Sequence, residues 1–199
     1  MASTLAADVA GTGAGGTISD DGVPNVSTIT IVEDEVIEDV RFSIEGLEHT
    51  WAGDLVVTVT HVDTGTTASL FNRPQRFPST TDTGDSSDLN GTYVFEDGGA
   101  DFWQETASQP NEGVVTPGTY FASDIAGNPV SLNDLFGGES SAGDWQISIS
   151  DEFEREVGSF AAWSLEFGTA TAVPEPGTAV SLGLLAMLGG TFYRRRKQS

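Results

Sequence analysis

Alternating apolar and polar residues dominate this chain from residue 27 onward, and helical spacing is nearly absent. The run Leu55–Val59, entered through Trp51-Ala52-Gly53-Asp54, predicts a buried strand after a turn, with the strands before and after it as partners. About eight such strands separated by turn residues indicate an antiparallel β-sandwich of jelly-roll type. The expected strands cover residues 27–32, 36–44, 54–61, 66–71, 91–95, 119–121, 143–150 and 158–167.

The last two expected strands carry the clearest alternation. Residues 143–150 and 158–167 place apolar side chains, including Trp145 and Trp163, at every second position. The acidic segment 151–157 between them predicts a turn, so the two strands are expected to form a hairpin with one wet face.

Other segments lack this alternation. Residues 1–16 are rich in Ala, Gly, Ser and Thr, which predicts a disordered lead-in. Asp8 interrupts its only mildly apolar stretch and no basic residue precedes it, so no secretory signal is expected there. Residues 72–90 and 104–118 are expected to be loops, and Ser131–Phe136 one helical turn capped by Ser131.

The composition is strongly acidic and lacks cysteine. The chain has 30 acidic and 8 basic residues, a net charge of −22, and four of the basic residues lie in the last six positions. Such a surface repels nucleic acid and anionic lipid, and it suits divalent cations, cationic partners or a salty medium. A merely solubilising surface is the alternative. The absence of cysteine excludes disulfides, thiolate metal sites and a cysteine nucleophile.

Four aspartates near turns suggest a calcium site. Calcium takes six to eight oxygen ligands from carboxylates, carbonyls and water. Asp54 lies at a strand mouth, Asp97 and Asp101 flank a glycine turn, and Asp88 precedes the same strand. We therefore expect Asp54, Asp88, Asp97 and Asp101 to contribute to calcium binding, and solvated loop carboxylates are the alternative.

The histidines and tryptophans point to structural roles. A subtilisin-type triad needs Asp, His and Ser in hydrogen-bond order, but neither His49 nor His61 has a protease-like sequence context. We expect no catalytic triad, with His49 tying the turn to the strand at 54–61 and His61 ending that strand at the surface. Trp145 and Trp163 are expected in the core, and Trp103 is the candidate for an exposed sugar-stacking ring.

The C-terminal tail is a separate unit. Val173, Pro174, Glu175 and Pro176 form a rigid break. The 17 uncharged residues that follow would span roughly 26 Å as a helix, and the adjacent basic cluster would stay cytoplasmic. A buried core helix with a basic tip is the alternative. The span includes Gly177, Leu182, Leu184, Leu185, Leu188, Phe192 and Tyr193, and the basic end comprises Arg194, Arg195, Arg196 and Lys197.

This tail, residues 170–199, resembles a PEP-CTERM sorting signal. Val-Pro-Glu-Pro, an apolar span and a terminal arginine cluster occur in that order. The resemblance implies a Gram-negative bacterium, an inner-membrane stage during export, and processing at Pro-Glu-Pro by an exosortase-type enzyme. It also implies a final place at the cell surface or outside the cell, with a link to extracellular polysaccharide.

Residues 17–169 resemble the P/Homo B domain of subtilisin-like proprotein convertases. The matching pieces are His49-Thr50 with Gly53-Asp54-Leu55, Leu89 through Asp97, Leu132 through Gly137, Gly143-Asp144-Trp145 with Asp151, and Gly158 with Trp163 through Phe167. The resemblance implies a β jelly roll that stabilises and regulates a serine endopeptidase, and calcium binding in some members.

Two functions are therefore expected from the sequence. The first is an exported, non-catalytic β-sandwich module, used for binding or as a structural part of the surface or matrix. The alternative is the regulatory P domain of a subtilisin-like protease whose catalytic domain lies upstream or on a separate chain.

Overall fold

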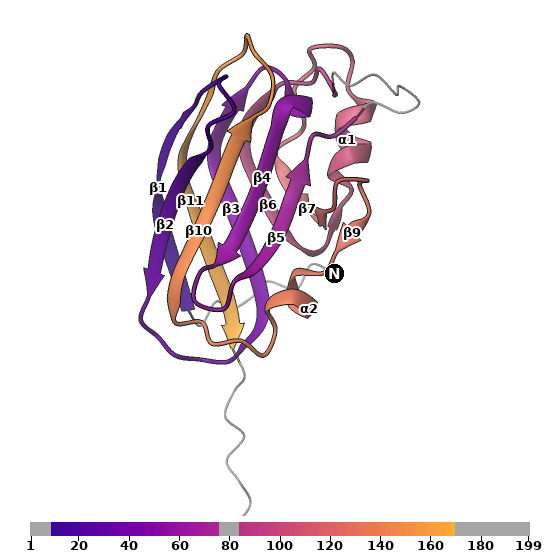
Figure 1. Ribbon diagram of the computed structural model, residues 1–199. Coiled ribbons are helices and arrows are strands. Elements are labelled where there is room, and N and C mark those ends of the chain that lie inside the picture. Colours follow the sequence, from indigo (N-terminus) through magenta and orange to yellow (C-terminus); the bar gives the residue numbers. More distant parts are fainter. Residues whose placement is uncertain (1–8, 76–83, 170–199) are drawn as a thin grey trace, which may run out of the picture.

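A computed structural model describes residues 9–75 and 84–169, which fold into a sandwich of two β-sheets (Figure 1). The strands are β1 (Val9–Ile18), β2 (Asn25–Ile31), β3 (Ile37–His49), β4 (Leu55–His61), β5 (Thr66–Asn72), β6 (Leu89–Ala100), β7 (Gly118–Tyr120), β8 (Ala122–Ser123), β9 (Pro129–Val130), β10 (Gly143–Asp151) and β11 (Gly158–Thr169). The helices are η1 (Ala52–Asp54), α1 (Phe102–Ser108) and α2 (Leu132–Phe136).

The two large sheets confirm the predicted β-sandwich. The five-stranded sheet has the order β1-β11-β3-β6-β7, the four-stranded sheet has the order β2-β10-β4-β5, and β8 pairs with β9. All these pairs are antiparallel except β6 with β7, which is parallel. A parallel neighbour needs a crossover connection, and the segment that contains α1 supplies it. The jelly-roll connectivity stays a prediction.

The expected hairpin of the last two strands is wrong, because β10 and β11 lie in opposite sheets. β10 pairs with β2 and β4, and β11 pairs with β1 and β3. Their apolar faces meet across the core, where the rings of Trp145 and Phe167 lie 4.9 Å apart. Period-two alternation reports which face is buried, and it does not report which strand is the neighbour. For the same reason β4 pairs with the following strand β5 but not with the preceding strand β3.

The expected disorder of residues 1–16 is wrong for residues 9–16, which belong to β1. This strand pairs with β11 along its length. Its glycines fit because neighbouring side chains occupy the space that a Cβ would need: Ile29 lies there at Gly11, and the indole of Trp163 lies there at Gly13. Glycines allow such close approach of the backbone. Because they have no side chains, they also remove the alternation of apolar and polar residues by which a strand is predicted from sequence.

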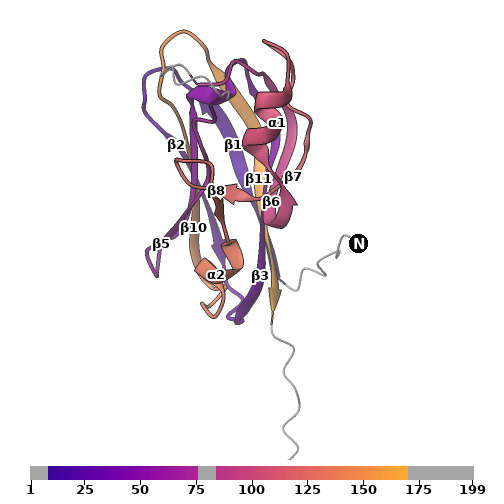
Figure 2. The same ribbon diagram turned by 90° about the vertical axis from the view of Figure 1, so that its right-hand side faces the viewer.

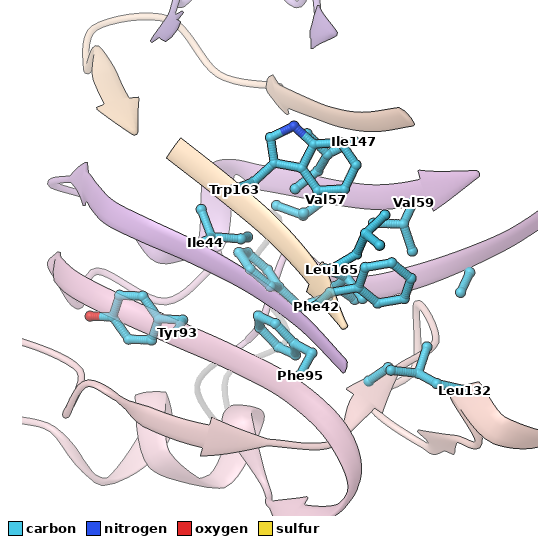
Figure 3. Close-up of a cluster of buried hydrophobic side chains, with 14 of the residues drawn as sticks. Phe42, Ile44, Val57, Val59, Tyr93, Phe95, Leu132, Ile147, Trp163 and Leu165 are labelled. Carbon is cyan, nitrogen blue, oxygen red and sulfur yellow. The ribbon is translucent and has the colours of Figure 1, made fainter. Parts of the chain in front are cut away.

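The core lies between the two sheets. Figure 3 shows Ile147, Val57 and Val59 from the four-stranded sheet facing Phe42 and Leu165 from the five-stranded sheet. Trp145 and Trp163 are also fully buried, as expected.

Two aromatic residues that were expected at the surface are buried. Trp103 is 5% exposed, because the segment expected to be a loop forms α1 and turns Trp103 inward. His61 is 1% exposed and its ring stacks on Trp145 at 4.2 Å. Its ring nitrogens contact Glu139 at 2.8 Å and the Ala142 carbonyl at 3.1 Å, and these polar partners make its burial tolerable.

The helices α1 and α2 lie on the side of the sandwich where β5 and β7 form the sheet edges (Figure 1, Figure 2). α2 is the predicted helical turn, and Ser131 caps it by accepting a hydrogen bond from the Asp134 backbone at 3.0 Å. Within residues 9–75 and 84–169, no helix has the length and apolar character needed to cross a membrane. The predicted processing motif (173–176), apolar span (177–193) and basic end (194–197) lie outside these described residues.

Candidate functional site

A cleft at one end of the sandwich combines a cavity with buried ionisable groups. It lies where η1 meets the turn that joins β10 to β11, and both are at the upper end in Figure 1. The cavity has a volume of about 530 Å³ and is lined by Trp51, Asp54 and residues 152–156. We call it the η1 cleft.

The backbone of η1 is fixed by the segment that precedes β6. The amides of Ala52 and Gly53 donate to the carbonyls of Ser87 and Asp85 at 2.8 and 2.9 Å. A Cβ at Gly53 would overlap the backbone of Gly84 and Asp85. Glycine is therefore required here by the close approach of two backbones, whereas the sequence had suggested a bend.

A histidine–aspartate pair lies beneath the cleft. His49 Nε2 lies 3.0 Å from Asp151 Oδ2, and both side chains are fully buried. His49 Nδ1 lies 3.1 Å from the backbone nitrogen of Trp51 and 3.0 Å from its carbonyl oxygen. His49 is thus a structural link, but the link joins the end of β3 to the end of β10 and not to the strand at 54–61. Both ring nitrogens are engaged in these contacts, and neither contacts a hydroxyl group in the described chain.

Asp54 lines the cleft and is 3% exposed. Its backbone carbonyl accepts a hydrogen bond from the Glu152 amide at 3.0 Å, but its carboxyl group makes no hydrogen bond within the described residues. Burial, together with the charges of Asp151 and Glu156, raises the pKa of Asp54 to about 7, although the charge of Arg73 acts in the opposite direction. Asp54 therefore changes its charge near neutral pH.

The turn over the cleft is acidic but is held by an arginine. The Arg73 guanidinium lies 4.3 Å above the ring of Phe153, and its Nε donates to the Gly53 carbonyl at 3.2 Å. Asp151 Oδ1 accepts from the Phe153 amide at 3.0 Å. These contacts hold the turn against η1.

The four predicted calcium ligands do not form one site. Asp97 accepts from Ser131 Oγ at 2.6 Å and from the Leu132 amide at 2.8 Å, and Asp101 caps α1 by accepting from the Gln104 amide at 3.0 Å. Across the ranges 9–75 and 84–169, no group of three or more His, Asp or Glu side chains could hold a metal ion. Asp97 and Asp101 thus each accept hydrogen bonds from amides at the start of a helix. Calcium binding stays a prediction.

Asp88 lies beside a second cavity, of about 520 Å³, that also contacts His49 and Asn90. Burial raises the pKa of Asp88, the charge of Glu112 raises it further, and His49 opposes them. Asp54 and Asp88 thus lie on different cavities at the same end of the sandwich.

Sequence reasoning selected His49 and Asp54 but did not join them to Asp151. The available signal was the position of Asp151 directly after the alternating stretch 143–150, since a residue at the end of a strand can be buried in the core. Asp85 was also missed. It is 1% exposed, and its Oδ1 accepts from the Ser87 amide and hydroxyl. Among the described residues, its Oδ2 has no hydrogen-bond partner.

Solved structures with some similarity share little sequence with this chain. The serine protease of Aeromonas sobria in complex with the chaperone ORF2 is 17% identical over 81% of this chain and 27% of that chain, with a TM-score of 0.44. The same protease alone is 17% identical over 79% and 27%, with a TM-score of 0.40. The structure of PfGH50B is 12% identical over 76% and 19%, with a TM-score of 0.33. The chain thus spans about a quarter of the length of the Aeromonas protease.

No curated protein matched the chain. Two family descriptions did match. Residues 123–167, which include β10, most of β11 and the turn over the η1 cleft, match the proprotein convertase P-domain. Residues 172–197 match the PEP-CTERM protein-sorting motif. The chain therefore carries, in this order, a segment of its β-sandwich that matches the proprotein convertase P-domain and a following segment that matches the PEP-CTERM protein-sorting motif.

Proposed function

We propose that this protein is an exported, non-catalytic β-sandwich module that an exosortase-type enzyme processes at Pro174-Glu175-Pro176. The observation that carries the proposal is the sorting motif at residues 172–197, which follows directly on β11 at the end of the sandwich. An apolar segment with a terminal basic cluster orients a chain across the inner membrane with its basic end in the cytoplasm. The sandwich then faces outward, and processing releases it to the cell surface or the extracellular matrix.

The non-catalytic part of the proposal is supported by the surroundings of His49. A serine protease needs a histidine nitrogen that accepts the proton of the serine hydroxyl. Here one ring nitrogen faces Asp151 and the other faces the backbone of Trp51. A binding or structural role, with extracellular polysaccharide as one candidate partner, fits this arrangement better than hydrolysis.

The P-domain segment at residues 123–167 favours a second function. In that case the sandwich stabilises and regulates a subtilisin-like serine endopeptidase, either upstream in the same polypeptide or on a separate chain. The two functions are compatible, since an exported regulatory domain would also need sorting.

The test is processing in a Gram-negative host that has an exosortase. The wild-type protein should reach the surface fraction with an intact mass that ends near residues 174–176. Replacement of Pro174, Glu175 and Pro176 by alanine should leave the tail uncleaved and the protein in the inner membrane, whereas the control Thr169→Ala should behave as wild type. Surface delivery of the triple variant with the same mass as wild type would refute the proposal. A co-purifying protein labelled by a serine-hydrolase probe would support the second function.

A further inference from the structure

We propose that the η1 cleft binds an organic cation, the guanidinium or ammonium group of a basic peptide side chain, with the Asp54 carboxylate as its counter-ion. The inference deepens the proposed binding function by naming a class of ligand. Cation binding is measured on the purified chain, whereas sorting is measured in a bacterial host. Failure of the binding test is therefore distinguishable from failure of the sorting test.

Asp54 is a buried carboxyl group at the wall of the cavity. A buried carboxylate is costly unless it is paired or hydrogen-bonded. Asp54 is 3% exposed, lines the cavity, and has no side-chain hydrogen bond in the described chain. Asp97, in contrast, is exposed and its carboxylate accepts two hydrogen bonds. Arg73 acts on Asp54 through its charge, which opposes the effect of burial, and a cation bound in the cleft would give the carboxylate a direct partner.

The charged side chains around the cavity are mostly acidic. Glu152, Glu154 and Glu156 line it together with Asp54, and Arg155 is the basic residue in the same lining. The net charge of the whole chain is −22, and the resulting negative potential concentrates cations near its surface. The ligand that this lining suits is positive.

The cleft suits an organic cation better than a metal ion. A metal ion needs several convergent oxygen ligands, and the described residues contain no suitable group of three. The volume of about 530 Å³ is that of a small-molecule pocket and far exceeds the needs of one ion. Trp51 contributes aromatic surface to the lining, and aromatic faces attract guanidinium and ammonium groups. The ring of Phe153 already carries the guanidinium of Arg73.

Binding should depend on pH because the cation needs the ionised form of Asp54. The charged groups that act on Asp54 are Asp151 and Glu156 from the end of β10 and its turn, and Arg73 from the segment after β5. Asp151 in turn contacts His49, and Glu152, Glu154 and Arg155 face the same cavity. With a pKa of about 7, Asp54 is roughly one-tenth ionised at pH 6 and nine-tenths ionised at pH 8. Affinity should therefore rise about tenfold between these pH values, and binding near pH 7 should release protons.

The experiment is calorimetric titration of the full chain at low salt with N-acetyl-arginine amide. The neutral isostere N-acetyl-citrulline amide is the ligand control. We expect saturable binding of the arginine compound at about pH 8, about tenfold weaker binding at about pH 6, and no binding of the citrulline compound. Asp54→Asn should weaken binding at least tenfold. Glu38→Gln removes an equal charge from an exposed site at the other end of β3 and should leave binding unchanged.

Several outcomes would overturn the inference. Equal binding of the arginine and citrulline compounds would show that charge is not recognised. Equal losses for Asp54→Asn and Glu38→Gln would show a diffuse effect of net charge. Saturable binding of calcium chloride with no binding of the arginine compound would replace the organic cation by a metal. If Asp54→Asn does not fold, as judged by circular dichroism, Glu156→Gln takes its place and should weaken binding severalfold.

Discussion

Asp54→Asn should stabilise the fold increasingly as the pH rises through the neutral range. The variant keeps the shape of the side chain and removes its ionisation. In the wild type the folded carboxyl group stays protonated up to about pH 7, whereas an unfolded aspartate ionises near pH 4. Between these values the folded state binds more protons than the unfolded state, so the free energy of unfolding falls as pH rises. Asparagine has no such dependence.

The size of the effect follows from the difference between the two pKa values. Each pH unit within the window changes the free energy of unfolding by about 1.4 kcal/mol. Measured from about pH 5 to about pH 7, the ionisation of Asp54 accounts for about 3 kcal/mol at most, and the change ends above pH 7. Relaxation of the cleft and entry of water reduce this value, so we expect a relative gain of at least about 1 kcal/mol for the variant.

The assay is urea unfolding of wild type and variant at about pH 5, 6, 7 and 8, followed by tryptophan fluorescence. At each pH, the free energy of unfolding of the wild type is subtracted from that of the variant. The contributions of the other ionisable groups are the same in both proteins and cancel in this difference. Asp97→Asn is the matched control. Asp97 is exposed and accepts two hydrogen bonds at the start of α2, so its loss should destabilise the fold by about 1 kcal/mol. A constant difference for Asp54→Asn between pH 5 and 8, or one that falls as pH rises, would refute the reasoning.

Two further predictions concern the framework of the cleft and the glycine-rich strand. His49→Ala leaves the fully buried Asp151 carboxylate without its histidine partner. It should lower the free energy of unfolding by about 3 kcal/mol in the same urea assay. A loss below about 1 kcal/mol would contradict the importance of this pair. Gly13→Ala places a methyl group against the Trp163 indole and should lower the free energy of unfolding by about 2 kcal/mol, measured as a lower melting temperature. The control Thr12→Ala, on the exposed face of the strand, should change the melting temperature little. Equal effects of the two substitutions would argue against the place of β1 in the sandwich.

The sequence predicted most strands because burial of one face leaves a pattern in the side chains. That pattern located Leu55–His61 and Gly143–Asp151 to within one residue. It could not locate β1, because Gly11 and Gly13 have no side chains to alternate. It also missed α1, a helix of 7 residues that is held by an aspartate cap and by the burial of Phe102 and Trp103, not by a periodic apolar stripe.

The candidate site was predictable only in part, because polar residues acquire their roles from distant segments. Asp97 and Asp101 suggested metal ligands from their glycine turn, yet each one satisfies amides at the start of a helix. His61 suggested a surface residue from its place at a strand end. Its burial depends on Glu139, which is 78 positions away in the chain. Such pairings are set by the tertiary fold and leave no local pattern.

The missed site and the wrong hairpin have one cause. If β10 and β11 were neighbours in one sheet, the turn 152–157 would only reverse the chain at the edge of that sheet. Because they lie in opposite sheets, this turn must cross the end of the sandwich. The crossing brings Glu152 against the backbone of Asp54 and places the glutamates of the turn around the cavity. It also directs Asp151, at the end of β10, onto His49, at the end of β3, so that the buried pair joins the two sheets at the base of the cleft. The η1 cleft is therefore a consequence of the change of sheet, and a sequence pattern that cannot assign strand neighbours cannot predict it.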